Sequence, residues 1–343
     1  MKLIKLLKKN YIISRHEFPD WLYKILTIFA KIINYFLIHK KQKNDIYIIS
    51  TFRSGSTWLA EILYNIPKTK YIHEPFSPYK FNIKNNIYPK KPDNLYISLT
   101  KSEESSFTEY IKKLSEGKIF ISRRYDILSS SFSLKTNRSV FKILRCSPLA
   151  EWFVNHYSDY FLFLIRHPLT TSVSKIQTGI KKDFQTSINK YLSDQKYVNK
   201  YLNNEILTYL DKNNNVFTEL EKETIIWCLD NLPLIHTYSK YKEYNNVALI
   251  TYEELLAYPE NTIKKIGNFL NLTNINKLTE NRSNASASVK YNINEKNYKN
   301  FEDNFNKLKE KITYFEAKNL IKILDIFNIR IYQYNNFLPV KIN

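Results

Sequence analysis

The sequence predicts a doubly wound α/β fold, in which an open parallel sheet is covered by helices on both faces. Two observations carry this prediction. Short apolar runs recur along the chain and each is followed by a polar or helical segment, as in parallel sheets whose strands are buried on both faces. The composition, with 43% hydrophobic and 15% aromatic residues, supplies a core and excludes wholesale disorder.

The elements follow from local patterning. The expected strands are 45–50, 70–72, 118–122, 140–144, 160–165 and 247–251. Helices are expected at 57–65, 221–241 and 313–327, where apolar residues recur on one side. Residues 181–224, rich in Asn, Lys and Tyr at helical spacing, form an expected helical insertion. We therefore divide the chain into a segment 1–43 and a catalytic-sized domain 44–343.

Residues 1–43 are predicted to form basic amphipathic helices. Lysines alternate with leucines and isoleucines over 1–13, and the apolar run 21–38 is interrupted by Lys24 and Lys31. A spanning helix needs ~20 mostly apolar residues, so these lysines disfavour a transmembrane span. Two interpretations stay open, a helix lying in an anionic membrane interface and a helix packed on the domain. The absence of a small-residue cleavage site disfavours a signal peptide.

Charge and cysteine content restrict the partners and the compartment. The chain has 52 basic and 32 acidic residues, a net charge of +20, which favours polyanions, anionic lipid or phosphorylated small molecules. Cys146 and Cys228 are too few for a disulfide framework, so we expect a cytoplasmic protein. No spacing among His, Cys and Asp indicates a metal site, and none is expected.

The loop 51–58 (Thr-Phe-Arg-Ser-Gly-Ser-Thr-Trp) joins the first strand to the first helix. Backbone N–H groups and the helix dipole favour an anion at such a position. Gly55 lets the backbone approach a phosphate closely, and hydroxyl donors come from Ser54, Ser56 and Thr57. An ATP-binding loop would be longer and end in Gly-Lys-Ser/Thr, which is absent. Arg53 instead offers a planar fork of donors for phosphate or sulfate oxygens.

A second motif follows the strand 160–165. The strand ends in Arg166-His167-Pro168, and Ser172 and Ser174 lie on the helix that Pro168 can start. Arg166 thus stands at the carboxyl end of a strand, where ligands of open α/β sheets bind. Together, the two strand-loop-helix units resemble the nucleotide-binding signature of the sulfotransferase family.

The resemblance covers about residues 45–272 and implies a three-layer, P-loop-like parallel sheet. In that family the first motif holds the 5′-phosphosulfate of 3′-phosphoadenosine 5′-phosphosulfate (PAPS), and the later Arg and Ser hold its 3′-phosphate. By resemblance the first role belongs to Arg53, Ser54, Gly55, Ser56, Thr57 and Trp58. The second role belongs to Arg166 and Ser174.

The carbohydrate sulfotransferase branch is the most similar. Its features here are the Arg-Ser-Gly-Ser loop, the Tyr-Ile-His-Glu-Pro-Phe stretch 71–76 and the Phe-Lys-Ile-Leu-Arg strand 141–145. Trp227 and the stretches 247–255 and 259–270 match the family's later pattern. The resemblance implies that the acceptor is a hydroxyl of a carbohydrate or glycolipid. Residues 79–96 and 181–224 are expected to shape its pocket.

The sequence also departs from the family's cytosolic branch, which acts on phenols and steroids. That branch carries Lys in the loop and a catalytic His on the strand corresponding to 140–145, whereas this chain has Lys142 and, at the histidine position, Leu144. The C-terminal Arg-Lys-Gly signature is missing, although the polar stretch 282–290, which begins with Arg282, could close over the nucleotide.

Sulfuryl transfer needs a stabilised leaving group, an acceptor hydroxyl held in line and a base for its proton. We assign leaving-group stabilisation to Arg53 and the loop N–H groups, with Lys142 or Arg145 as additional cations. Glu74 is the expected general base, and His73 is its nearest competitor. The other histidines singled out are expected to be structural: His156, His167 and His236.

Three other classes of function remain at this point. An ATP-dependent kinase is disfavoured by the missing Gly-Lys-Ser/Thr. A non-catalytic protein binding nucleic acid or membrane is disfavoured because lysine is spread along the chain without a recognisable module. A sulfotransferase relative without activity is disfavoured because the loop, Arg166, Ser174 and Glu74 are all present.

Overall fold

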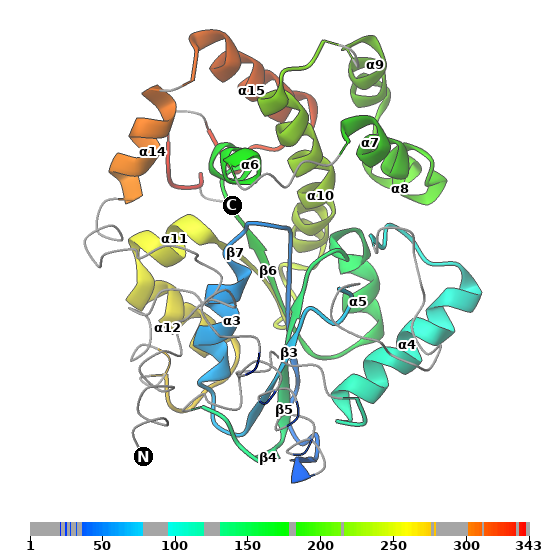
Figure 1. The fold of residues 1–343 in the computed structure, drawn as a ribbon, viewed down its shortest axis with the longest axis vertical. Coiled ribbons are helices and arrows are strands. Elements are labelled where there is room, and N and C mark those ends of the chain that lie inside the picture. The colour runs from blue at the N-terminus through cyan, green and yellow to red at the C-terminus, as the bar shows by residue number, and fades with distance from the viewer. Residues whose placement is uncertain are drawn as a thin grey trace.

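The structure, a computed structural model, describes residues 21, 25, 28, 32, 36–77, 95–119, 131–177, 183–213, 216–275, 278, 301–310, 312–333 and 336–340. Its centre is a five-stranded parallel sheet in the order β3-β5-β2-β6-β7 (Figure 1). The strands are β2 (Ile46–Ser50), β3 (Thr69–His73), β5 (Arg138–Ile143), β6 (Tyr160–Ile165) and β7 (Val247–Thr251).

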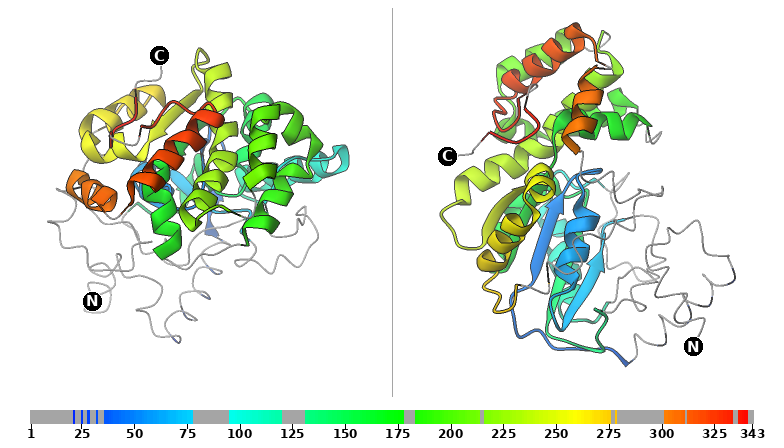
Figure 2. Two further views of the ribbon diagram at one scale, coloured as in Figure 1. Left: turned by 90° about the horizontal axis from the view of Figure 1, so that it is seen from above. Right: turned by 90° about the vertical axis from the view of Figure 1, so that its left-hand side faces the viewer.

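Both faces of the sheet are buried, as its continuous apolar strands require. Alternate residues of β2 divide between two cores, because successive side chains of a strand point to opposite faces. Tyr47 and Ile49 belong to one core, and Ile46 and Ile48 to the other. The first core is shared with α4 (Lys101–Ser115) and α5 (Ala150–His156), and the second with α3 (Ser56–Tyr64), α11 (Tyr252–Ala257) and α12 (Pro259–Phe269). This three-layer arrangement confirms the predicted fold class (Figures 1 and 2).

A group of helices stands beyond the carboxyl ends of the strands, at the top of Figure 1. Its members are α6 (Pro168–Gln177), α7 (Phe184–Leu192), α8 (Gln195–Tyr201), α9 (Asn204–Asn213), α10 (Glu219–Tyr241), α14 (Phe301–Glu310) and α15 (Tyr314–Ile326). Capping boxes start α10 at Thr218 and α15 at Thr313, each with a Glu three residues later. The helices expected at 221–241 and 313–327 and within 181–224 are thus present. The remaining short elements are β1 (Ile38–His39), β4 (Lys135–Thr136) and η3 (Ser147–Leu149).

The strand expected at 118–122 is wrong in its described part. Helix α4 ends in a Schellman motif at Gly117, whose φ is +78°. The N–H of Lys118 donates to the carbonyl of Lys113, and that of Gly117 to the carbonyl of Leu114. Lys118 and Ile119 therefore complete the end of a helix, and 120–122 lie outside the described residues.

The segment 1–43 is described only in part. Its five described residues before 37 are helical, 48% to 67% exposed and apolar: Trp21, Ile25, Ile28, Ile32 and Phe36. The end of the segment contacts the domain, since β1 pairs with β4 and the Lys41 ammonium lies 3.0 Å from the Asp159 carboxylate. Among the described residues, no helix is long and apolar enough to cross a membrane. The expected loop 282–290 and most of 79–96 lie outside the described residues.

Candidate active site

The strand ends bring the predicted site residues to one edge of the sheet. β2 leads into the loop 51–55, β3 into Glu74, β5 into Arg145 and β6 into Arg166. Because all four strands are parallel, their carboxyl ends lie at the same edge. The register places His73 directly beside Lys142. Residues separated by more than a hundred positions thus meet around the start of α3.

The loop conformation depends on Gly55. Its φ is +86°, in the left-handed region, and it is the N-cap of α3 without a side-chain cap for the first N–H groups. A Cβ at this position would lie 2.2 Å from Cδ2 of Tyr252, so the backbone lies directly against that ring. An uncapped helix N-terminus behind a tight turn is a binding site for an anion.

Hydroxyl groups surround this turn. The Oγ of Ser54 is buried without a hydrogen-bond partner, an arrangement that leaves this donor for a ligand. The hydroxyl of Thr57 accepts a hydrogen bond from Nζ of Lys142 over 2.8 Å. Ser56 is also buried, in the first turn of α3. The ring of Trp58, by contrast, packs edge-on against Tyr252 in the α3 core, so its side chain holds the loop in place.

Two guanidinium groups meet at the loop. Nε of Arg53 donates to Oγ of Ser174 over 2.9 Å, and Nη1 of Arg166 donates to the backbone oxygen of Arg53 over 3.1 Å. Burial, and then the charge of Arg166, lowers the pKa of Arg53. Arg53 nevertheless stays cationic, since arginine does not lose its proton in proteins. Two close positive charges are favourable where an anion lies between them.

A second cluster lies beside the loop. Nζ of Lys142, which is 3% exposed, lies 2.6 Å from Oε1 of Glu74 as well as contacting Thr57. Nε2 of His73 lies 3.5 Å from the same Glu74 oxygen, and Nδ1 shares a hydrogen bond with the Tyr71 hydroxyl over 2.8 Å. Lys142 therefore links the loop to the two groups that sequence analysis proposes as the base.

Backbone strain is concentrated here. Six described residues other than glycine have positive φ, and three of them are site residues: Arg53 (67°), Glu74 (48°) and Arg145 (73°). Such conformations cost of order 1–3 kcal/mol each and persist where the surrounding structure imposes them, often at functional sites. Each of the three lies within three residues after the end of a strand of the central sheet, β2, β3 or β5.

Two important residues follow β7, inside the stretch 247–255, and the sequence patterns assign neither of them a role in the site. Tyr252 packs against Gly55, and the guanidinium carbon of Arg166 lies 4.7 Å from the centre of its ring. The buried carboxylate of Glu253 accepts hydrogen bonds from the backbone N–H of His167 and the hydroxyl of Tyr332. Burial raises the pKa of Glu253 to about 7 and lowers that of His167 to about 4. The Tyr-Glu pair directly after a buried strand was the available signal.

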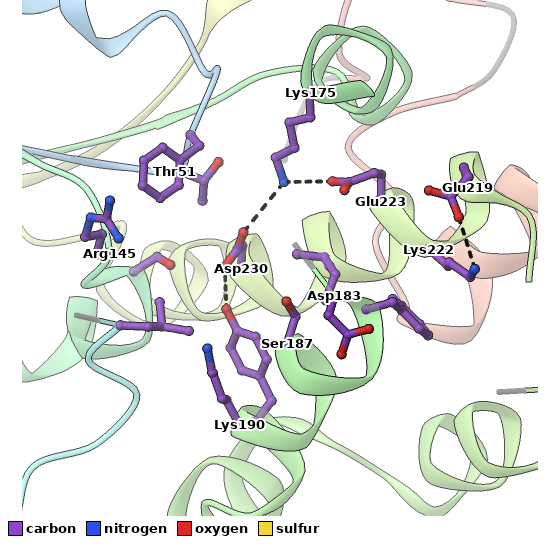
Figure 3. Close-up of a pocket in the computed structure, with 16 residues that line it drawn as sticks. Thr51, Arg145, Lys175, Asp183, Ser187, Lys190, Glu219, Lys222, Glu223 and Asp230 are labelled. Carbon is purple, nitrogen blue, oxygen red and sulfur yellow. Dashed lines mark hydrogen bonds and ion pairs between the residues drawn. The ribbon is translucent and has the colours of Figure 1, made fainter. Parts of the chain in front are cut away.

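A cavity of about 410 Å³ opens beside Thr51 and Phe52 of the loop, between α6, α7 and α10 (Figure 3). Its lining contains four cationic side chains: Arg145, Lys175, Lys190 and Lys222. It also contains four acidic side chains: Asp183, Glu219, Glu223 and Asp230. The expectation that 181–224 shapes a pocket agrees with this lining, to which that segment contributes half of the residues. The volume lies in the usual range for small-molecule sites, roughly 300–1,000 Å³.

Part of the chain matches a known protein family. Residues 160–322 match the family described as "Sulfotransferase domain"; the match includes Arg166 and Ser174 and begins after the loop. No curated protein matches the chain.

Similar solved structures include the sulfotransferase domain from the curacin biosynthetic pathway, with 14% identity over 84% of this chain and 99% of that one (TM-score 0.45). Mouse sulfotransferase SULT7A1 complexed with PAP has 14% identity over 87% and 89% of the two chains (TM-score 0.38). A sulfotransferase from Alicyclobacillus acidocaldarius has 13% identity over 83% and 96% (TM-score 0.39).

Proposed function

We propose that this protein is a sulfotransferase and that it transfers the sulfuryl group of PAPS to a hydroxyl of a carbohydrate or glycolipid acceptor; its match to the sulfotransferase domain supports this. The match supports the predicted enzyme class. One observation carries the choice of donor: two guanidinium groups, Arg53 and Arg166, meet at the uncapped N-terminus of α3. A donor with two phosphate groups suits a site with two neighbouring arginines.

The turn and its hydroxyls fit the 5′-phosphosulfate. The buried Oγ of Ser54 has no partner, Gly55 allows close backbone approach, and Arg53 supplies a charged fork. Arg166 and Ser174 lie on the β6–α6 side of the loop, where they would hold the 3′-phosphate. Tyr252 fixes both groups of residues, because it packs under Gly55 and against Arg166.

The chemistry is an in-line displacement at sulfur. The acceptor oxygen forms a bond to sulfur while the bond from sulfur to the 5′-phosphate oxygen breaks, and the acceptor proton passes to a base. Arg53 and the N–H groups of α3 stabilise the charge that develops on the leaving phosphate. Glu74 takes the proton. Because Lys142 contacts Oε1 of Glu74 over 2.6 Å, the other carboxylate oxygen, Oε2, is the one proposed to receive the proton.

The lining of the cavity supports a carbohydrate acceptor. Half of its 16 side chains are charged, and Thr51, Ser147 and Ser187 add hydroxyls. A pocket for a steroid or a simple phenol would be lined mainly by apolar groups. The cavity starts at the loop itself, at Thr51 and Phe52, so a hydroxyl bound there is next to the donor position.

Peripheral contact with an anionic membrane is part of the proposal. The five described residues before 37 are apolar, helical and exposed: Trp21, Ile25, Ile28, Ile32 and Phe36. Exposed apolar residues in a segment rich in lysine suit the interface of an acidic bilayer.

The donor assignment is tested by thermal unfolding. 3′-Phosphoadenosine 5′-phosphate (PAP) should raise the melting temperature far more than ATP with magnesium, because ligands that bind the native state stabilise it. Incubation with sulfur-labelled PAPS and a glycan mixture should then label a glycan. Stabilisation by ATP equal to or above that by PAP would contradict the proposed donor.

A further inference from the structure

The charges that line the cavity balance one another. Its four cations and four acids sum to zero at neutral pH, in a chain whose net charge is +20. The cavity is therefore unlike the surface as a whole, which attracts anions.

One network at the centre of the lining is acidic. Nζ of Lys175 lies 3.4 Å from Oε2 of Glu223 and 4.0 Å from Oδ2 of Asp230, so two carboxylates share this ammonium (Figure 3). The hydroxyl of Tyr191 donates to the other oxygen of Asp230. The side chains of Glu223 and Asp230 keep 18% and 13% of their surface exposed. Each carboxylate has about four lone-pair positions, so both retain capacity to accept further hydrogen bonds.

Neighbouring ammonium and carboxylate groups can both hydrogen-bond to sugar hydroxyls, since each hydroxyl accepts from an ammonium and donates to a carboxylate. Hydrogen bonds with one charged partner are also roughly twice as strong as neutral ones. Phe52 and Phe184 add aromatic faces to the same lining, and the C–H face of a sugar ring can pack on such a face. The combination fits a ring that has many hydroxyls and no charge.

We infer that the acceptor presents an uncharged sugar to this cavity and that Glu223 and Asp230 select it by accepting hydrogen bonds from its hydroxyls. The inference rests on the proposed sulfuryl transfer. It narrows the acceptor class, because uronate-, phosphate- and amine-bearing sugars are then disfavoured. Repulsion from the Glu223–Asp230 pair disfavours the first two, and an amine would have to compete with the Lys175 ammonium for the same two carboxylates.

The experiment uses the full chain and oligosaccharides of matched length in four forms, neutral, uronate-bearing, phosphorylated and amine-bearing. Binding to PAP-saturated protein is measured by calorimetry, and label transfer from PAPS is measured separately. We expect the neutral member to bind and to be labelled in preference to the others. Preference for any charged member, or no glycan binding at all, would overturn the inference. Glycan binding without PAP stabilisation or label transfer would instead contradict the proposed donor chemistry and support the cavity assignment.

Two variants identify the selecting residues. Asp230→Asn and Glu223→Gln keep size and remove charge, and each should raise KM for the neutral acceptor roughly ten- to a hundredfold, the range for a hydrogen bond to a charged group. PAP affinity should stay unchanged. Glu243→Gln, at an exposed position outside the cavity, is the matched control. Unchanged KM in both cavity variants would assign selection to other residues.

Discussion

Nε of Arg53 donates a hydrogen bond to Oγ of Ser174 over 2.9 Å, although the two residues lie 121 positions apart in the chain. The resemblance assigns Arg53 to the 5′-phosphosulfate and Ser174 to the 3′-phosphate. Their contact makes the two halves of the proposed donor site one continuous surface. A substitution in either half should therefore weaken binding of the whole nucleotide.

Replacement of Arg166 tests this surface. Arg166→Ala should weaken PAP binding by roughly 1.5–3 kcal/mol, the range for a lost hydrogen bond to a charged group, and calorimetric titration measures it. Arg330→Ala, which removes an exposed arginine far from the strand ends in sequence, serves as the control. If both variants bind PAP like the unmodified protein, the 3′-phosphate site lies elsewhere.

The base is tested by paired variants. Glu74→Gln removes basicity while keeping size, and turnover should fall roughly 10²- to 10⁴-fold, as for a lost general base. PAP affinity should stay normal. His73→Ala should retain much more activity, because its Nδ1 is engaged with Tyr71 and its Nε2 lies 3.5 Å from Glu74. The opposite ranking in steady-state kinetics would assign the base to His73.

The buried Glu253 predicts a pH dependence of stability. Its pKa is about 7 in the folded protein against a usual value of 4.5, so the folded state binds its proton more tightly than the unfolded state. Its contribution to stability is present below pH 4.5 and is lost as the pH rises through 7. Burial shifts the pKa of His167 the other way, to about 4. The contribution of His167 to the stability of the protein is therefore lost as the pH falls from 6.5.

Because these two effects oppose each other, Glu253→Gln should be compared with the unmodified protein at each pH. The free energy of unfolding of the variant, relative to the unmodified protein, should rise from pH 4.5 to 7.5 by roughly 3 kcal/mol. Urea titrations at several pH values measure this difference. A difference that does not change with pH would mean that Glu253 titrates normally in the folded state.

Membrane contact is tested without disturbing the fold. Lys41 forms an ion pair with Asp159 and β1 pairs with β4, so deletion of all of 1–43 would remove contacts of the domain. The triple substitution Ile25→Ser, Ile28→Ser and Ile32→Ser changes only exposed positions. It should release the protein from acidic phosphatidylserine vesicles in a sedimentation assay and leave PAP binding intact. Ile321→Ser, at a 41% exposed isoleucine of α15, should have no effect on sedimentation.

The sequence predicted what depends on local patterning. The strands at the sheet centre were found because each is a short apolar run, and the loop because its Ser-Gly-Ser turn directly follows one. The strand predicted from the apolar run 118–122 is wrong at residues 118 and 119, because Gly117 directly before them ends α4 in a Schellman motif.

The cavity could not be predicted in detail. Lys175, Glu223 and Asp230 come from α6 and α10, and nothing in their local sequence indicates that the three meet. The same holds for Lys142, whose contacts with Thr57 and Glu74 depend on the strand order of the sheet. Single-sequence patterns report neighbours along an element, while these contacts depend on the tertiary fold.

The packing of Tyr252 against Gly55 restricts how these two positions can change during evolution. A larger residue at position 55 would collide with the ring and would also be strained at φ +86°, so the ring and the glycine limit each other. Lineages that descend from a common ancestor with this chain should therefore keep the two together, or change them in the same episode. Coupled variation between two distant positions, one in the first turn and one after the last strand, would then identify such a donor site more reliably than the turn motif alone.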